Sequence, residues 1–310
     1  MAAIRNIFFI ILMLTAIQSN AYSRGFPQDS LEYRNFKILY PKDQPGSGKN
    51  VLRLLQNHVA RFDDFYGVKS DREIRILVAG SAVEFQTLAN VHAPQWAAAL
   101  YFPGRKQMVV KSPRWAGSLT NLEQHILHEL SHAYFHEVFA GRKLPLWFNE
   151  GMAEYLSNAR IDLTKALKLA NAFVAHNLVG FEEINSLITF DSQTRAELAY
   201  LQSLSAFMFL QDLIGGRESM PAFQNKIVSD GWPAALQAAT GMDDIDFEIA
   251  WHRHIRDEYR WLLILNLENL LWPAVILFLF IGFLVIRRRN KRKIRRWDAE
   301  ESGESFSELQ

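Results

Sequence analysis

The first part of the chain alternates between strand-like and helix-like patterns of apolar residues. Residues 36–40 and 73–78 read as strands, the second with the alternation of a half-buried strand. Between them, apolar residues over 51–66 recur at the spacing of one helix face. Residues 97–102 and 107–111 predict a hairpin around a Pro-Gly pair. The pattern therefore predicts a small sheet with a helix beside it.

From residue 119 onward the apolar pattern is almost wholly helical. Mixed strands and helices come first and helices alone follow, an order that predicts an α+β domain over residues 22–260. The expected domain has a small mixed sheet beside a helical half. Ahead of the first helix, Pro45-Gly46-Ser47-Gly48 predicts a turn or loop.

A short apolar run lies near the N-terminus. It covers residues 7–17, follows Arg5, and precedes Ser19 and Ala21, which match a small-x-small cleavage site. The run suits a signal peptide over 1–21 and is short for a membrane span. An uncleaved signal anchor is the alternative, and both interpretations export the residues that follow.

A second apolar run covers residues 270–286 and predicts one transmembrane helix. The basic run 287–296 follows at once and would stay in the cytoplasm by the positive-inside rule. The sequence thus predicts a single-pass protein of the cell inner membrane with a periplasmic, extracytoplasmic domain. A basic and then acidic tail, 287–310, would lie in the cytoplasm.

The composition of the chain excludes several kinds of site and function. The chain has no cysteine, which excludes a disulfide framework, a cysteine-ligated zinc and a cysteine nucleophile. Its net charge is +1, and outside the basic run the chain is close to neutral. Bulk nucleic-acid binding therefore has little support.

One helical segment carries the pattern His-Glu-x-x-His, from His128 through Glu129 to His132. Residues four apart on a helix lie on nearly the same face, so both imidazoles can bind one zinc ion. Glu129 lies beside the first histidine and can reach the open coordination position, where water binds. The motif alone is short enough to arise by chance.

A downstream motif supplies a candidate third ligand. Gly141 and Pro145 break the first helix, and a second helix beginning near Asn149 would carry Glu150 and Glu154 on one face. Glu150 is the predicted third zinc ligand. Glu154 can accept the other N–H of a ligating histidine and fix its tautomer, or it can be a surface carboxylate.

Together, HELSH and NEGMAEY resemble the gluzincin clan of metallopeptidases, which includes thermolysin and the zinc aminopeptidases. The closer resemblance is to bacterial peptidase MA-like domains, over about residues 75–255. It implies a thermolysin-like catalytic domain with His128, His132 and Glu150 as Zn²⁺ ligands and Glu129 as general base. It also gives Tyr200, on a later helix, the role of steadying the oxyanion, although a buried packing tyrosine is the simpler alternative.

The resemblance implies a peptide or protein substrate, here in the cell envelope, which can lie along the strand of the 97–111 hairpin. No G-x-M-E-N-like segment is found on that strand, a departure that favours an endopeptidase over an aminopeptidase. A catalytically quiet, zinc-stabilised binding module is the rival interpretation, and a structural membrane protein with an accidental motif is a third. His136, one turn past His132, is a packing residue or a fourth ligand that would close the site.

Overall fold

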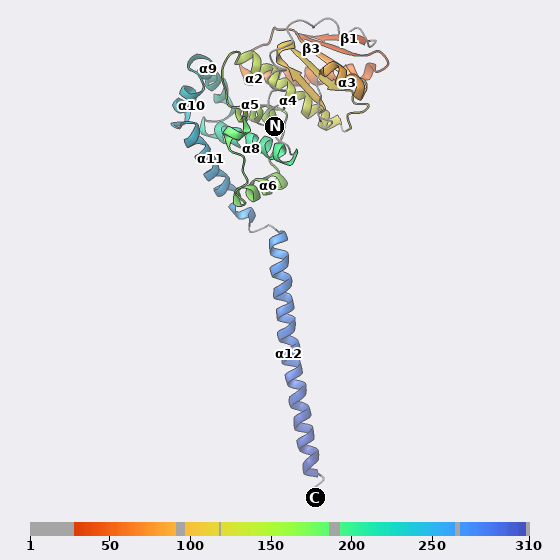
Figure 1. The fold of residues 1–310 in the computed structure, drawn as a ribbon, viewed down its shortest axis with the longest axis vertical. Coiled ribbons are helices and arrows are strands. Elements are labelled where there is room, and N and C mark those ends of the chain that lie inside the picture. The colour runs from red at the N-terminus through yellow and green to blue at the C-terminus, as the bar shows by residue number, and fades with distance from the viewer. Residues whose placement is uncertain (1–27, 91–96, 118, 186–192, 264–266, 308–310) are drawn as a thin grey trace, which may run out of the picture. The chain divides into compact units, whose positions relative to one another are not determined.

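The computed structural model describes residues 28–90, 97–117, 119–185, 193–263 and 267–307. The chain divides into two compact units, residues 1–257 and 258–310. The first unit contains a mixed sheet followed by helices, as the apolar pattern predicts (Figure 1).

The sheet has the strand order β1-β2-β3-β5-β4. The β2/β3 and β3/β5 pairs are parallel, and the outer pairs β1/β2 and β4/β5 are antiparallel. The strands are β1 (Gln28–Tyr33), β2 (Phe36–Pro41), β3 (Ile74–Ala79), β4 (Ala99–Phe102) and β5 (Gln107–Lys111). Among the described residues, β4 is therefore an edge strand that pairs with a neighbouring strand, β5, on one side only.

Helices cover both faces of this sheet. Leu77 and Val109 pack against α3 (Ala82–Ala89) on one face. Side chains alternate along a strand, so the neighbouring residues Ile76 and Val110, both fully buried, point to the other face. On that side α2 (Pro45–Tyr66) packs against β1 and β2, and α4 (Leu119–Val138) packs against β4.

Helix α2 begins earlier than the sequence predicts. The glycine-rich segment expected to be a loop forms its first turn, with Pro45 at a position where no backbone N–H is needed. Gly48 is buried there against Tyr40, and a Cβ at residue 48 would lie 2.3 Å from the tyrosine ring. Gly48 therefore permits close packing of α2 against Tyr40, whereas the sequence pattern attributes this glycine to a turn.

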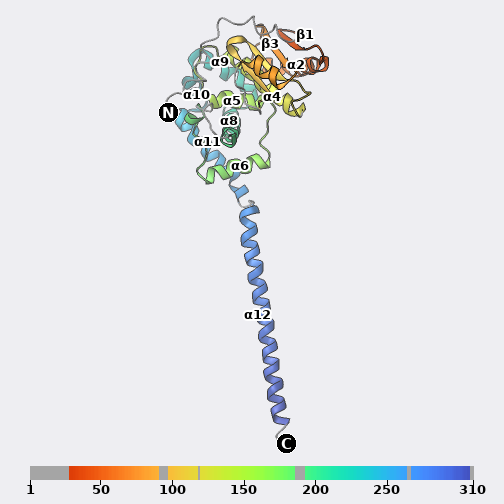
Figure 2. The same cartoon turned by 45° about the vertical axis from the view of Figure 1, so that its right-hand side comes forward.

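The helical half follows α4 and surrounds α8, which lies next to α5 in both views (Figures 1 and 2). Its core is aromatic: the Trp147 ring stacks on Phe181 and Phe247, with centroids 4.8 and 5.2 Å away. The helices are α5 (Leu146–Leu156), α6 (Leu163–Val174), α7 (Phe181–Ile184), α8 (Gln193–Leu213), α9 (Met220–Asp230), α10 (Trp232–Thr240) and α11 (Asp244–Tyr259).

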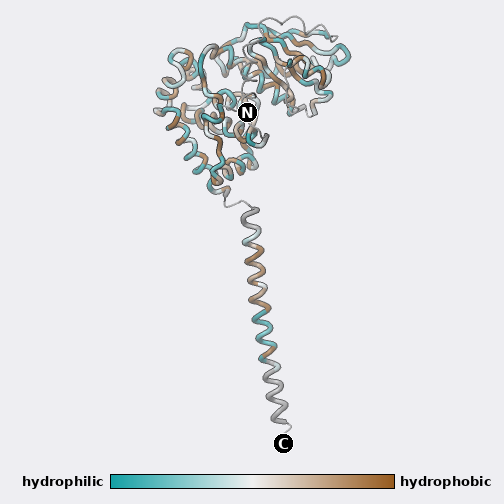
Figure 3. Tube along the Cα trace, viewed as in Figure 1, coloured by the Kyte–Doolittle hydropathy of each residue, from teal (hydrophilic) through white to brown (hydrophobic). Residues whose placement is uncertain are grey.

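The second unit contains α12 (Leu267–Ser307), whose exposed apolar stretch passes directly into a polar one (Figure 3). The same helix continues through Arg287 without a break. Over the ranges that the structure describes, no helix combines the length and apolarity needed to cross a membrane.

The prediction of a transmembrane helix over 270–286 is therefore wrong. The single-pass placement in the inner membrane, with a periplasmic domain and the cytoplasmic tail 287–310, rested on that helix and is corrected with it. The apolar composition was read correctly, but the helix continues without a break into basic residues. The predicted signal peptide, 1–21, lies outside the described residues.

Candidate metal centre

Helices α4 and α5 bring three side chains of the two motifs together. His128 and His132 lie one turn apart on α4, with their Nε2 atoms 3.1 Å apart. Oε2 of Glu150, on α5, is 3.3 Å from Nε2 of His128 and 3.6 Å from Nε2 of His132. The donor atoms of this cluster all lie within 4.8 Å of one another, close enough to hold a metal ion.

Helix α4 is fixed to α2 by hydrogen bonds on the side away from the cluster. Ser131 lies between the two histidines in sequence, and its hydroxyl and carbonyl oxygens are 2.8 and 3.1 Å from the buried Tyr66 hydroxyl. One turn later, Tyr134 donates its hydroxyl to Asp63 over 2.6 Å, and Arg34 pairs with the same carboxylate. These bonds fix the rotation of α4 and so aim His128 and His132.

Helix α5 is placed by its contact with α8. Gly151 follows Glu150, and a Cβ on it would lie 2.4 Å from the carbonyl oxygen of Ser203 and 2.6 Å from Cβ of Phe207. A helix-interior glycine costs about 1 kcal/mol relative to alanine, so its presence here reflects the close approach of the two helices. Gly151 therefore sets how closely α5, the helix that carries Glu150, approaches α8.

Each histidine has a polar partner on the ring nitrogen that faces away from the cluster. Nδ1 of His128 lies 3.2 Å from Oε1 of Glu154. Nδ1 of His132 lies 3.0 Å from Oδ1 of Asn149, a contact that sequence reasoning missed. Such partners hold the other ring nitrogen toward a metal. The feature of the sequence that could have indicated the His132 contact is the asparagine directly before Glu150.

The side chains of the cluster shift one another's pKa values. Burial disfavours a charged His128, yet Glu150 and Glu154 raise the pKa of its imidazole well above the usual value. Burial likewise opposes ionisation of Glu150, but His132 and His128 outweigh it and lower the pKa of this carboxyl. An ionised carboxylate against two imidazoles attracts a cation to the space between them.

The donor set fits a divalent metal ion such as zinc. Glu150 is 9% exposed, and its Oε2 finds no hydrogen-bond donor among the described residues. Its nearest polar groups are the Nε2 atoms of His128 and His132, 3.3 and 3.6 Å away, and a cation held between the three would satisfy this buried carboxylate oxygen. Two imidazole nitrogens and one carboxylate oxygen match a three-ligand zinc site that leaves a fourth position open.

Glu129 occupies the position next to this cluster. Its Oε2 accepts the backbone N–H of Tyr101, on edge strand β4, over 2.7 Å. Burial raises the pKa of the Glu129 carboxyl, and the nearby His132 and His128 oppose that rise. A carboxyl with a raised pKa beside a candidate metal site holds a proton more readily than an ordinary glutamate.

Tyr200 reaches the same cleft from α8. Its ring centroid lies 6.0 Å from that of His128, so the structure brings it beside the cluster rather than into the core beneath it. The charge of Glu150, then burial, raises the pKa of the Tyr200 phenol well above its usual value. The hydroxyl therefore remains protonated and is available as a hydrogen-bond donor.

A cleft of about 650 Å³ opens onto these groups. Ala99 and Leu100 of β4, Glu129 of α4, and Tyr200 and Leu204 of α8 are among the residues that line it. A second lobe of about 540 Å³ shares His128 and Glu154 with it. The edge strand β4 thus runs beside the candidate metal site.

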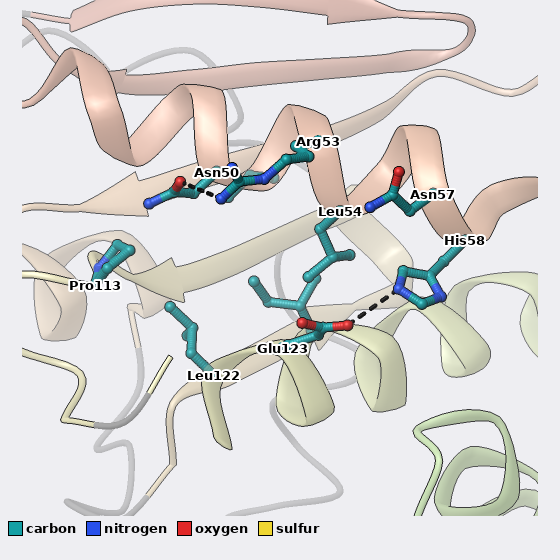
Figure 4. A pocket seen from close by; sticks show the side chains of 10 residues that line it. Asn50, Arg53, Leu54, Asn57, His58, Pro113, Leu122 and Glu123 are labelled. Carbon is teal, nitrogen blue, oxygen red and sulfur yellow. Dashed lines mark hydrogen bonds and ion pairs between the residues drawn. The ribbon is translucent and has the colours of Figure 1, made fainter. Parts of the chain in front are cut away.

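His136 is not part of the cluster within the described side chains, so it does not close the site as a fourth donor. Its ring lies 6.3 Å from the ring of Tyr101. A further pocket of about 100 Å³ lies between α2 and α4, where His58 Nε2 and Glu123 Oε1 pair at 3.0 Å (Figure 4). None of the candidate metal donors lines it.

The α+β domain thus carries a His-His-Glu cluster that could hold a metal ion beside an edge strand. The family model described as the peptidase MA superfamily matches residues 55–257, more than half of the chain. The chain belongs to the peptidase MA superfamily. This confirms the family resemblance in HELSH and NEGMAEY. A search of curated proteins found no match.

Proposed function

We propose that this protein is a zinc-dependent peptidase that cleaves peptide bonds within polypeptide chains. The observation that carries the proposal is the convergence of His128, His132 and Glu150 within 4.8 Å, with Glu129 beside them in the lining of the cleft. Peptidase MA membership supports the peptidase class. The metal, the reaction and the residue roles below are the proposal.

Zinc bound by the three donors would supply a Lewis acid that polarises the scissile carbonyl and activates water. The protein's own contribution begins with orientation. Glu154 and Asn149 hold the outer nitrogens of His128 and His132, so both Nε2 atoms point at one position. The buried Glu150 carboxylate balances part of the metal charge and excludes bulk water from that side.

Glu129 is the proposed general base. Its carboxylate takes the proton of the attacking water and then gives it to the nitrogen of the leaving amine. The hydrogen bond from Tyr101 fixes one carboxylate oxygen, and this leaves Oε1 to face the reacting water. Burial raises the pKa of the Glu129 carboxyl, which favours holding the proton between the two transfers.

Tyr200 is the proposed donor to the oxyanion. Negative charge develops on the carbonyl oxygen as water adds, and a protonated phenol at the cleft wall can donate a hydrogen bond to it. The raised pKa of the phenol keeps that proton in place. The bond would strengthen as charge grows, so it lowers the barrier more than it tightens substrate binding.

The substrate is proposed to be an extended peptide. Strand β4 is an edge strand, and a peptide can pair as an added strand with the side that faces away from β5. The cleft continues past His128 into a second lobe, so room for a chain exists on both sides of the cluster. This arrangement favours cleavage within a chain over removal of terminal residues.

The test uses the full chain loaded with zinc and an unstructured protein such as casein. We expect cleavage products by mass spectrometry, loss of cleavage with a zinc chelator, and recovery when zinc is returned. Zinc bound at one equivalent without any cleavage would overturn the proposal in favour of a zinc-stabilised binding module. Absence of bound metal would overturn the zinc site itself.

A further inference from the structure

The lobe of the cleft beyond His128 differs from the lobe along β4 in the residues that line it. Residues of α4, the end of α5 and the start of α6 enclose about 540 Å³, and polar side chains dominate its lining. It shares His125, His128, Glu154 and Lys165 with the lobe that runs along β4. A peptide that extends from β4 past the metal donors would therefore enter it.

Two cations line this lobe without a carboxylate within ion-pair distance among the described residues. The structure shows no ion pair to Arg160 or to Lys165 within the residues it describes. Arg160 is exposed and Lys165 is half-buried. Lys168, one turn further along α6, differs because it pairs with Glu197 at 3.7 Å.

The carboxylates in the lobe are already engaged. Glu154 lies 3.2 Å from Nδ1 of His128. Asp162 caps α6, where its Oδ1 accepts the backbone N–H of Lys165 over 2.9 Å. The lobe therefore offers two positive side chains, with the half-buried His125 and the amide of Asn121 as additional polar groups.

We propose that this lobe is a substrate subsite for a carboxylate, and that Arg160 and Lys165 determine specificity for it. The inference rests on the proposed peptidase function and adds the class of peptide that the cleft selects. A guanidinium and an ammonium that line the same pocket can bind a carboxylate through charge-assisted hydrogen bonds. The carboxylate is either an acidic side chain within a longer peptide or the C-terminal carboxylate of a short one.

Binding is measured separately from turnover, with zinc-loaded Glu129→Gln protein and fluorescein-labelled octapeptides. In one set of alanine-rich peptides with blocked termini, a single Glu occupies each position in turn. In the matched set, Gln occupies the same position. A third peptide carries Gln and a free C-terminal carboxylate. We expect one register of Glu, or the free C-terminus, to bind about tenfold more tightly than the neutral peptide.

Variants then assign the preference to the two cations. Lys165→Met and Arg160→Met should each reduce it, and the double variant should abolish it. Arg53→Met serves as the control, because Arg53 lies on α2 and lines a different pocket (Figure 4). Lys165→Glu should reverse the preference toward a peptide with Lys at the same position.

The outcomes separate this inference from the proposed function. Cleavage of the neutral peptide by wild-type protein, with no advantage for either carboxylate, overturns the subsite alone. Carboxylate binding that depends on Lys165 without any cleavage supports the subsite and overturns the peptidase. A preference that persists in the double variant assigns the carboxylate to the metal rather than to Arg160 and Lys165, and also overturns the subsite.

Discussion

Tyr101 donates its backbone N–H to Oε2 of Glu129 over 2.7 Å. This hydrogen bond joins the edge strand β4 to the helix that carries both motif histidines. The strand proposed to bind the substrate thus also fixes the proposed general base, so the position of the peptide and that of the base are set by one element. Neither position can shift without the other.

Substitutions of Glu129 test its proton-transfer role. Glu129→Gln preserves an oxygen for the Tyr101 N–H but cannot accept a proton, so we expect activity to fall by about 10²–10⁴-fold. Zinc content, measured by elemental analysis, should not change. Glu129→Asp shortens the side chain and should lose both the Tyr101 contact and most activity. Undiminished cleavage by the Gln variant would contradict the role.

Loss of a proposed ligand should remove the metal. His128→Ala and Glu150→Ala each leave two of the three donors, so we expect no zinc at one equivalent after dialysis and no activity. Zinc that binds only the native state stabilises it, so the added metal should raise the Tm of wild-type protein and not of the variants. His136→Ala is the matched control, because that histidine lies outside the cluster.

The partners behind the histidines should have a smaller effect. Asn149→Ala removes the acceptor of the His132 Nδ1–H, and Glu154→Gln weakens the partner of His128. We expect each to weaken zinc binding by about 10–100-fold while zinc in excess restores activity. Competition with a chromogenic chelator measures the affinity. Unchanged zinc affinity in both variants would show that neither residue orients a ligand.

The motif residues could be predicted from sequence because helix geometry is local. Four residues along a helix place His128 beside His132 whatever the rest of the fold does. The same rule places Glu154 one turn after Glu150. Contacts between separate elements could not be predicted, because they depend on how a strand and a helix are aligned. Tyr101 is such a case, since no spacing relates it to Glu129.

Other differences between the sequence-based prediction and the structure also have physical reasons. Gly48 is typical of a turn, but here it permits close packing of α2 against Tyr40. The apolar residues of 270–286 belong to a helix that continues through Arg287 to Ser307. Composition alone gives no information on where a helix ends. Asn149 was within the quoted motif, yet its role became visible only once its distance to His132 was known.

Tyr200→Phe tests the oxyanion donor without changing the shape of the cleft. The hydroxyl is proposed to act on charge that exists only during the reaction, so we expect kcat to fall by about 10²–10³-fold with little change in KM. Zinc content and Tm should stay close to wild type. A fall in Tm with kcat retained would instead assign Tyr200 a packing role. Steady-state kinetics on one fluorogenic peptide separates these outcomes.

Gly151→Ala tests whether the spacing of α5 and α8 sets the third donor. Alanine would ordinarily stabilise a helix interior, but its Cβ would lie 2.4 Å from the backbone oxygen of Ser203. Helix α5 must shift, and we expect a destabilisation of about 1–3 kcal/mol in chemical unfolding.

Because Glu150 precedes this glycine, the same shift should weaken zinc binding. Gly46→Ala is the matched control: residue 46 is also helical, and a Cβ there meets nothing within 4 Å. The control should be neutral or slightly stabilising and should keep its zinc affinity. If Gly151→Ala loses stability but binds zinc as tightly as wild type, the position of Glu150 is set by α4 rather than by α8.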